Sequence, residues 1–166
     1  IMNIYPALVS GLTACIDKRF SVSEFWNRIR HYGANHTMTL GTMHVYLMQQ
    51  PPRADDHDNT LRTLVMNPVI PQLVDPFKER FGVELVAAGF GQSEIMGATL
   101  YRDDWGLKPG SLGFVRDDDL VETKLLDEND NEVAVGATGE ICVRPRESFT
   151  IFNGYFRQPE LTTQAW

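Results

Sequence analysis

Short apolar runs alternate with amphipathic stretches along the first two thirds of the chain. Four of the runs are short, apolar and bounded by polar or turn-forming residues, which is typical of strands; they are residues 12–16, 36–40, 61–66 and 83–88. The stretches between them have helical spacing. Because strands separated by helices build βαβ units, the pattern predicts a parallel sheet.

Three helices are predicted between these strands. Ser21 and Glu24 have the spacing of a capping box, and the helix that follows them is expected to stop near Gly33. Residues 42–50 form the second predicted helix, before two prolines. The third covers residues 71–81, ends before a glycine and carries an apolar stripe that favours core packing; its members are Leu73, Val74, Phe77 and Phe81.

Prolines and glycines punctuate shorter apolar runs after about residue 101. Residues 120–126 and 140–143 are predicted strands, and the polar residues 127–131 form the expected turn after the first of them. We therefore predict an α/β fold. A parallel βαβ half-sheet covers residues 1–105, an antiparallel β subdomain covers 106–150, and a tail over 151–166 packs back with a short helix near 159–166.

Composition and charge exclude several classes of protein. The 166 residues are 43% hydrophobic and 22% charged, as in ordinary globular proteins, and the net charge of −7 argues against a nucleic-acid partner. Cys15 and Cys142 are too few for a disulfide scaffold. No apolar run is long enough for a membrane span, and the start lacks the basic region of a signal peptide. We expect a soluble cytoplasmic protein, and the start at Ile1 and stop at Trp166 suggest a piece of a longer one.

A glycine-rich stretch with a hydroxyl and a carboxylate follows the predicted strand 83–88. It reads Gly89-Phe90-Gly91-Gln92-Ser93-Glu94. Small residues let a backbone come close to a ligand, and a hydroxyl and a carboxylate suit a phosphate and a Mg²⁺ ion. The end of a parallel strand is also where such folds bind ligands. The simpler alternative is a glycine-rich turn that ends in an exposed glutamate.

Two other readings of polar residues are weaker. Residues 91–95 nearly match the Gly-x-Ser-x-Gly elbow of serine hydrolases, but Ile95 replaces the last glycine and the four histidines all precede Ser93. A hydrolase is therefore a remote alternative. The acidic residues 55–58 are expected to form a solvated loop, and no histidine spacing indicates a metal site.

Three segments in the same order and at similar separations resemble the adenylate-forming acyl-CoA synthetases, the AMP-forming acid–CoA ligases. They are residues 89–94, 139–143 and 154–162, with support from 19–21 and 80–83. Residues 50–52 and 151–156 are most similar to the crotonobetaine/carnitine–CoA ligase branch. The resemblance runs along essentially the whole chain but covers only a central part of the family's N-terminal domain.

The resemblance implies an enzyme that uses ATP and Mg²⁺ to convert a carboxylic acid to an acyl-adenylate and then forms a thioester with CoA, as in fatty acid or carnitine metabolism. It implies that Glu94 is the Mg²⁺ carboxylate and that the Ser93 hydroxyl contacts the α-phosphate. Phe90 would stack on adenine, with Gly89, Gly91 and Gln92 beside the nucleotide. The acyl or CoA pocket would involve Gly41, Thr42, Met43, Gly97 and Ala98.

Some features depart from the family pattern. Phe90 and Ser93 stand where the family usually has Tyr and Thr, and residues 65–71 replace a Gly-Gly-Ala-Pro-like turn. The phosphate loop with its lysine, the Thr-Gly-Asp segment and the C-terminal domain are missing N-terminal and C-terminal parts of the same polypeptide. We therefore predict an isolated chain without catalytic activity. The alternative is a non-catalytic nucleotide- or partner-binding module.

Overall fold

A computed structural model describes residues 4–106, 108 and 110–166. Contacts between backbone positions divide the chain into two compact units. The first is Ile1–Ala88 with Tyr101–Ser111, and the second is Gly89–Leu100 with Leu112–Trp166.

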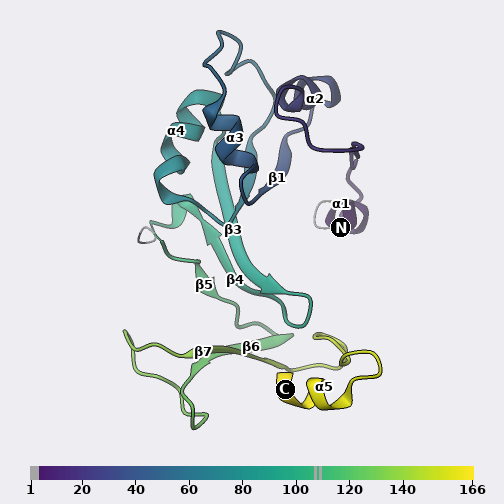
Figure 1. The fold of residues 1–166 in the computed structure, drawn as a ribbon, viewed down its shortest axis with the longest axis vertical. Coiled ribbons are helices and arrows are strands. Elements are labelled where there is room, and N and C mark those ends of the chain that lie inside the picture. The colour runs from purple at the N-terminus through teal and green to yellow at the C-terminus, as the bar shows by residue number, and fades with distance from the viewer. Residues whose placement is uncertain (1–3, 107, 109) are drawn as a thin grey trace. The chain divides into compact units, whose positions relative to one another are not determined.

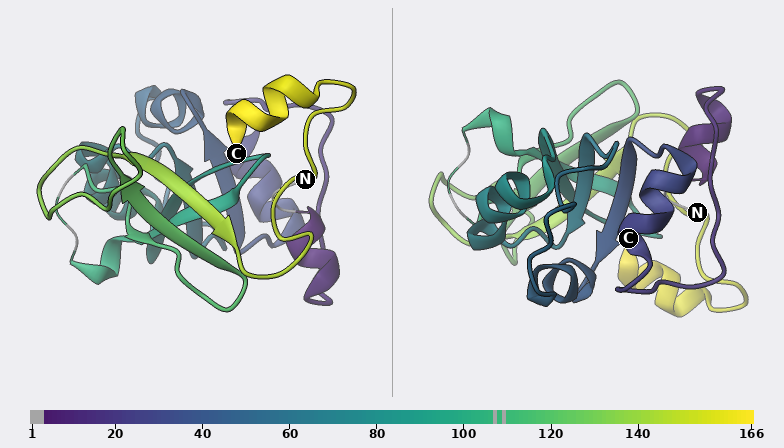
Figure 2. Two further views of the ribbon diagram at one scale, coloured as in Figure 1. Left: turned by 90° about the horizontal axis from the view of Figure 1, so that it is seen from below. Right: turned by 90° about the horizontal axis from the view of Figure 1, so that it is seen from above.

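The first unit contains most of the helices and the parallel strands (Figure 1). Its elements are α1 (Ile4–Val9), α2 (Phe25–Tyr32), β1 (His36–Leu40), α3 (Met43–Gln49), β2 (Thr63–Asn67), α4 (Pro71–Phe81), the start of β3 (Leu85–Gln92) and η1 (Asp103–Trp105). Strands β1 and β2 pair in parallel, with His36 opposite Thr63, and β2 and β3 pair in parallel, with Thr63 opposite Leu85. Figure 2 shows the helices of this unit beside these strands.

The second unit is mainly antiparallel. After the end of β3 it contains most of β4 (Met96–Arg102), then β5 (Phe114–Val115), β6 (Val121–Leu126), β7 (Glu140–Pro145) and α5 (Pro159–Ala165). Strands β6 and β7 form a two-stranded antiparallel sheet, in which Glu122 lies opposite Arg144. The Arg144 side chain donates to Glu122 Oε2, an opposite-charge pair that supports this register.

The strand order confirms the predicted α/β fold. Five strands form one sheet in the order β1-β2-β3-β4-β5, in which the first three are parallel and β4 pairs with β5 antiparallel. The predicted strand 36–40 and helix 71–81 have the observed bounds, and the predicted C-terminal helix is α5.

The apolar stripe of α4 packs into the core of the first unit, as its spacing predicted. Val74, Phe77 and Phe81 are buried, and Leu73 is half-buried. The Phe81 ring stacks on Trp26 of α2 with 4.2 Å between ring centroids. The helix ends where Gly82 takes a left-handed conformation with φ of 70°, which a glycine adopts without strain.

Two predictions near the N-terminus are wrong. Residues 12–16 form no strand: Leu12 and Ile16 are exposed, so this apolar run does not pack into the core as a buried strand would. The capping box is also absent, because helix α2 starts only after Glu24 and no side chain caps it. Helix α1 has no counterpart among the predicted elements.

The acidic loop after α3 is not simply solvated, which corrects the expectation for residues 55–58. Asp56 is 6% exposed and accepts a hydrogen bond from Arg80 Nε at 2.7 Å and from the Arg53 backbone N–H at 3.0 Å. Arg80 also donates to the carbonyls of Met48 and Pro51. One half-buried guanidinium therefore joins α4 to the end of α3 and to this loop.

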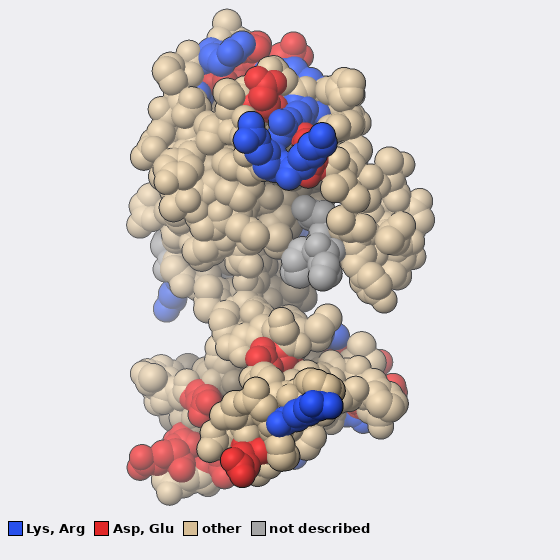
Figure 3. Space-filling view, turned by 45° about the vertical axis from the view of Figure 1, so that its right-hand side comes forward, with Lys and Arg blue, Asp and Glu red and all other residues tan. Residues whose placement is uncertain are grey.

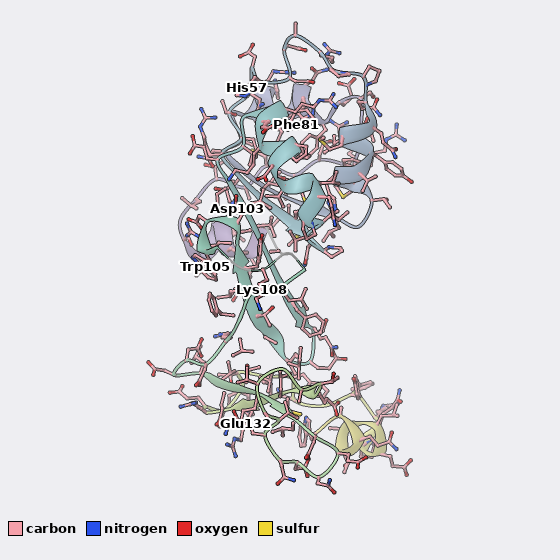
Figure 4. All side chains as sticks on the ribbon, turned by 90° about the vertical axis from the view of Figure 1, so that its left-hand side faces the viewer. His57, Phe81, Asp103, Trp105, Lys108 and Glu132 are labelled. Carbon is pink, nitrogen blue, oxygen red and sulfur yellow. The ribbon has the colours of Figure 1, made fainter. Side chains whose placement is uncertain are left out.

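The same region is tightly packed around Gly82. A side chain there would meet the ring of His57, because a Cβ would lie 2.8 Å from its Nδ1 (Figure 4). Asp103 of η1, also labelled in Figure 4, ties α4 to β3: it pairs with Lys78 and accepts the Val86 backbone N–H at 3.0 Å. Asp103 of η1 therefore holds both α4, through Lys78, and the start of β3, through Val86.

We predict that Asp56→Ala lowers the free energy of unfolding by about 3 kcal/mol, because it leaves the half-buried Arg80 guanidinium without its counter-charge. Urea denaturation measures the loss. The matched control is Glu84→Ala, which removes the exposed partner of Arg62 and should cost at most about 1 kcal/mol. Equal losses in the two variants would contradict a structural role for the buried pair.

Candidate functional site

The glycine-rich stretch lies inside a strand rather than after one. Strand β3 continues to Gln92, four residues beyond the predicted end at residue 88, and β4 begins at Met96. Only Ser93–Ile95 form the turn between them. The structure therefore places Gly89, Phe90, Gly91 and Gln92 in the strand and presents Ser93 and Glu94 at the tip of a hairpin.

The two glycines allow β3 and β4 to approach each other closely. A Cβ on Gly91 would lie 2.0 Å from the carbonyl oxygen of Met96, and one on Gly89 would lie 2.6 Å from that of Thr99. Any other residue would force the two backbones apart. The close approach that the sequence suggested is thus made by the chain to itself, and approach to a ligand stays a prediction.

A buried threonine ties this hairpin to the next segment. Thr99 of β4 is 5% exposed, and its Oγ1 accepts the Phe90 backbone N–H at 3.0 Å and donates to the Leu112 carbonyl at 2.7 Å. The hydroxyl therefore fixes the backbone at Phe90, whose side chain is half-buried. Sequence analysis missed Thr99, because a threonine in a strand is too common to stand out.

Glu94 is held by two contacts from the C-terminal segment. The Tyr155 hydroxyl donates to Glu94 Oε1 at 2.7 Å, and the Phe152 backbone N–H donates to the Glu94 carbonyl at 3.0 Å. The hydrogen bond to Glu94, helped by partial burial and by the nearby charge, raises the pKa of Tyr155 above its ordinary value. The neighbouring Ser93 is exposed. Tyr155 was recognised only as part of a motif, not as a site residue.

The remaining candidates lie in two places. Gly97 and Ala98 are in β4: Ala98 is fully buried, whereas the position of a Cβ on Gly97 has nothing within 4 Å, so open space adjoins that strand. Gly41, Thr42 and Met43 belong to the first unit, at the end of β1 and the start of α3. The hairpin thus brings Gly89–Ala98 together, and the other three residues form a separate group.

Met43 lines a cavity of about 790 Å³ within the first unit. Gly41 has a φ of 53° and donates its N–H to the Asn67 carbonyl at 2.9 Å, which ties the end of β1 to the end of β2. Thr42 is exposed and precedes α3 without a side-chain cap. Of these three residues, only Met43 is among those that line the cavity.

Glu94 offers a half-buried carboxylate, whereas the described residues form no complete protein cage for a metal ion. Within the described residues no group of three or more His, Cys, Asp or Glu side chains could hold a metal. Mg²⁺ is commonly bound by one or two carboxylates, with phosphate and water completing its shell. The half-buried carboxylate of Glu94 fits that arrangement. His44 does not contribute to it: it is buried, its Nδ1 lies 3.1 Å from Thr39 Oγ1, and burial lowers its pKa.

The face of the molecule drawn in Figure 3 carries both basic and acidic side chains and shows no broad basic patch. Several charged residues of the chain form ion pairs, such as Arg28 with Asp17 at 2.7 Å. No helix in the described part of the chain is both long and apolar enough to cross a membrane.

The fold is mixed α/β, with a five-stranded sheet that begins with three parallel strands and a separate two-stranded antiparallel sheet. The sequence model of the AMP-binding enzyme family matches residues 1–156, and the chain belongs to this family. This confirms the resemblance stated from the sequence motifs.

The chain is also similar to individual curated proteins. The chain is 32% identical to the crotonobetaine/carnitine–CoA ligase of Salmonella typhimurium over 167 aligned positions, which cover 96% of this chain and 31% of that protein. The chain therefore spans about a third of the length of the curated relatives it matches.

Solved structures share the fold. The O-succinylbenzoate CoA synthetase of Bacillus subtilis, in complex with AMP, superposes with a TM-score of 0.78 at 19% identity, covering 98% of this chain and 32% of that one. ATP-bound MatB from Rhodopseudomonas palustris gives a TM-score of 0.77 at 21% identity, covering 95% and 30%. At these identities the likeness concerns the fold.

We predict that Gly91→Ala lowers the free energy of unfolding by about 1–3 kcal/mol or more, because the added methyl group collides with the Met96 carbonyl. The control is Gly97→Ala in the adjoining strand, where the methyl group has room and the stability should be unchanged or up to about 1 kcal/mol higher. Urea denaturation compares the two. A tolerated Gly91→Ala would show that the strands do not need this close approach.

Proposed function

We propose that this chain is a central part of an ATP-dependent acid–CoA ligase. The parent enzyme joins a carboxylic acid to ATP to give an acyl-adenylate and pyrophosphate, and the CoA thiol then displaces AMP to give the thioester. Membership of the AMP-binding enzyme family supports this proposal. The structural observation that carries it is the Ser93–Glu94 turn, in which a half-buried carboxylate adjoins an exposed hydroxyl.

The proposed chemistry explains why these side chains are needed. A carboxylate oxygen is a poor leaving group, and its transfer to the α-phosphorus of ATP turns it into part of AMP, which leaves readily. Negative charge is spread over phosphate oxygens during this transfer, so positioning and cations carry the catalysis. Bound Mg²⁺ would neutralise part of that charge.

In this proposal Glu94 holds the Mg²⁺ ion and the Ser93 hydroxyl donates to an α-phosphate oxygen. The ring of Phe90 stacks on adenine, beside Gly89, Gly91 and Gln92. Gly97 and Ala98 line the acyl pocket, and the open space beside Gly97 is consistent with that role. Gly41, Thr42 and Met43 border the acyl or CoA channel. The names of the curated relatives favour a small acid of the crotonobetaine or carnitine type.

We further propose that these 166 residues alone do not complete the reaction. The resemblance assigns the triphosphate loop, the ribose-binding aspartate and the catalytic lysine to segments that the sequence does not contain. Codons for those segments on both sides of this sequence in its gene would support the ligase, whereas stop codons or unrelated sequence would favour a separate binding module.

We predict that the purified chain binds ATP more tightly with Mg²⁺ than in EDTA, and that Glu94→Gln removes most of this difference, about tenfold or more. Isothermal titration calorimetry measures both conditions. The control is Glu84→Gln, an exposed glutamate of the first unit.

The same preparation should release no pyrophosphate in an acid-dependent manner. Such a release, abolished by Glu94→Ala, would refute the proposed inactivity of the isolated chain. A chain that binds neither MgATP nor AMP would contradict the proposed nucleotide site.

A further inference from the structure

We propose that Tyr155 is a positioning residue for Glu94 and that Thr162 of α5 holds Tyr155 in place. The segment Gly154–Thr162 would then act as a support that aims the Glu94 carboxylate. This inference rests on the proposed function, because it assigns Glu94 to a magnesium–nucleotide complex. All the residues concerned belong to the second unit.

The first step is the double attachment of Glu94. Its side chain accepts the Tyr155 hydroxyl at 2.7 Å, and its backbone carbonyl accepts the Phe152 N–H at 3.0 Å. The ring of Phe152 also meets the ring of Tyr155 edge-on, with 5.1 Å between centroids. The side chain and the backbone of Glu94 are thus fixed by two residues of one segment that is distant in the sequence.

The second step is the attachment of Tyr155 itself. Its backbone N–H donates to Thr162 Oγ1 at 2.8 Å, and that hydroxyl donates in turn to the Gln158 carbonyl at 2.9 Å. Thr162 therefore uses its hydroxyl as both acceptor and donor, which a valine of the same shape could not do.

Gly154 makes this attachment sterically possible. Its φ is 101°, a conformation that disfavours other residues, and a Cβ there would lie 2.7 Å from Thr162 Cγ2. Gly154, Tyr155 and Thr162 therefore all take part in one contact, which joins Tyr155 to the first turn of α5.

The third step concerns the effect of the Tyr155 phenol on the Glu94 carboxylate. The Tyr155 hydroxyl donates to Oε1 of Glu94, and no described residue donates a hydrogen bond to Oε2, so Oε2 is available to a cation. Outer partners of metal-binding carboxylates fix their orientation, and losing such a partner typically weakens metal binding about 10–100-fold. Tyr155 meets this description as the hydrogen-bond partner of Glu94.

The first test does not depend on the proposed function. Carbon-13 labelling of the tyrosine rings gives one resonance for each of the 5 tyrosines, and Tyr155→Phe identifies that of Tyr155. We expect Glu94→Gln to shift the Tyr155 resonance, since the charged acceptor of the Tyr155 hydroxyl is lost. An unchanged resonance would overturn the inference.

The second test separates positioning from a general loss of structure. Calorimetry with MgATP and with ATP in EDTA should show that Tyr155→Phe weakens MgATP binding about 10–100-fold and leaves binding in EDTA unchanged. Thr162→Val should act in the same direction. The controls are Tyr5→Phe, on an exposed side chain of α1, and Thr163→Val, whose hydroxyl bonds only to Pro159 within α5.

The outcomes are distinguishable. Unchanged MgATP binding in Tyr155→Phe, or equal losses with and without Mg²⁺, would overturn the positioning role. Absence of MgATP binding in the wild-type chain would contradict the proposed function instead, and the Tyr155 resonance in Glu94→Gln would then decide whether Tyr155 is held by Glu94.

Discussion

The close approach of β3 and β4 is the constraint on which the candidate site depends. Two carbonyl oxygens of β4 occupy the places where side chains at Gly89 and Gly91 would begin. Because the strands are this close, the hairpin closes with only Ser93–Ile95 between them, and Ser93 and Glu94 come to lie at its tip. Gly89 and Gly91 are therefore needed for the close pairing of β3 and β4, whether or not a ligand is bound.

Two further networks hold the segments that lead into and support this hairpin. In the first unit, half-buried charges of α4 tie the helix to its surroundings: Arg80 binds Asp56 and two carbonyls, and Lys78 pairs with Asp103, which also accepts the N–H of Val86. In the second unit, neutral hydroxyls have the corresponding role, through Thr99 and Thr162. Both kinds of contact bond to backbone groups, so they fix the course of the chain as well as the positions of side chains.

The separated sequence motifs acquire a physical meaning from these contacts. Glu94 and Tyr155 are 61 positions apart in the sequence and share a hydrogen bond of 2.7 Å. The glycine-rich motif supplies the carboxylate, and the Gly154–Thr162 motif supplies the hydroxyl that donates a hydrogen bond to it. A family likeness based on several spaced motifs thus corresponds, in this chain, to one connected structure around Glu94.

The sequence by itself determined the elements whose signal is local. Strand β1 and helix α4 could be predicted with their observed bounds, because apolar periodicity and a terminal glycine are read within a few residues. The tertiary structure alone decided the extension of β3 to Gln92, the burial of Asp56, the absence of a strand at residues 12–16 and the bond between Tyr155 and Glu94. Each of these depends on which distant segment lies alongside, since strand pairing, burial of a charge and a side-chain hydrogen bond need a partner that local sequence does not specify.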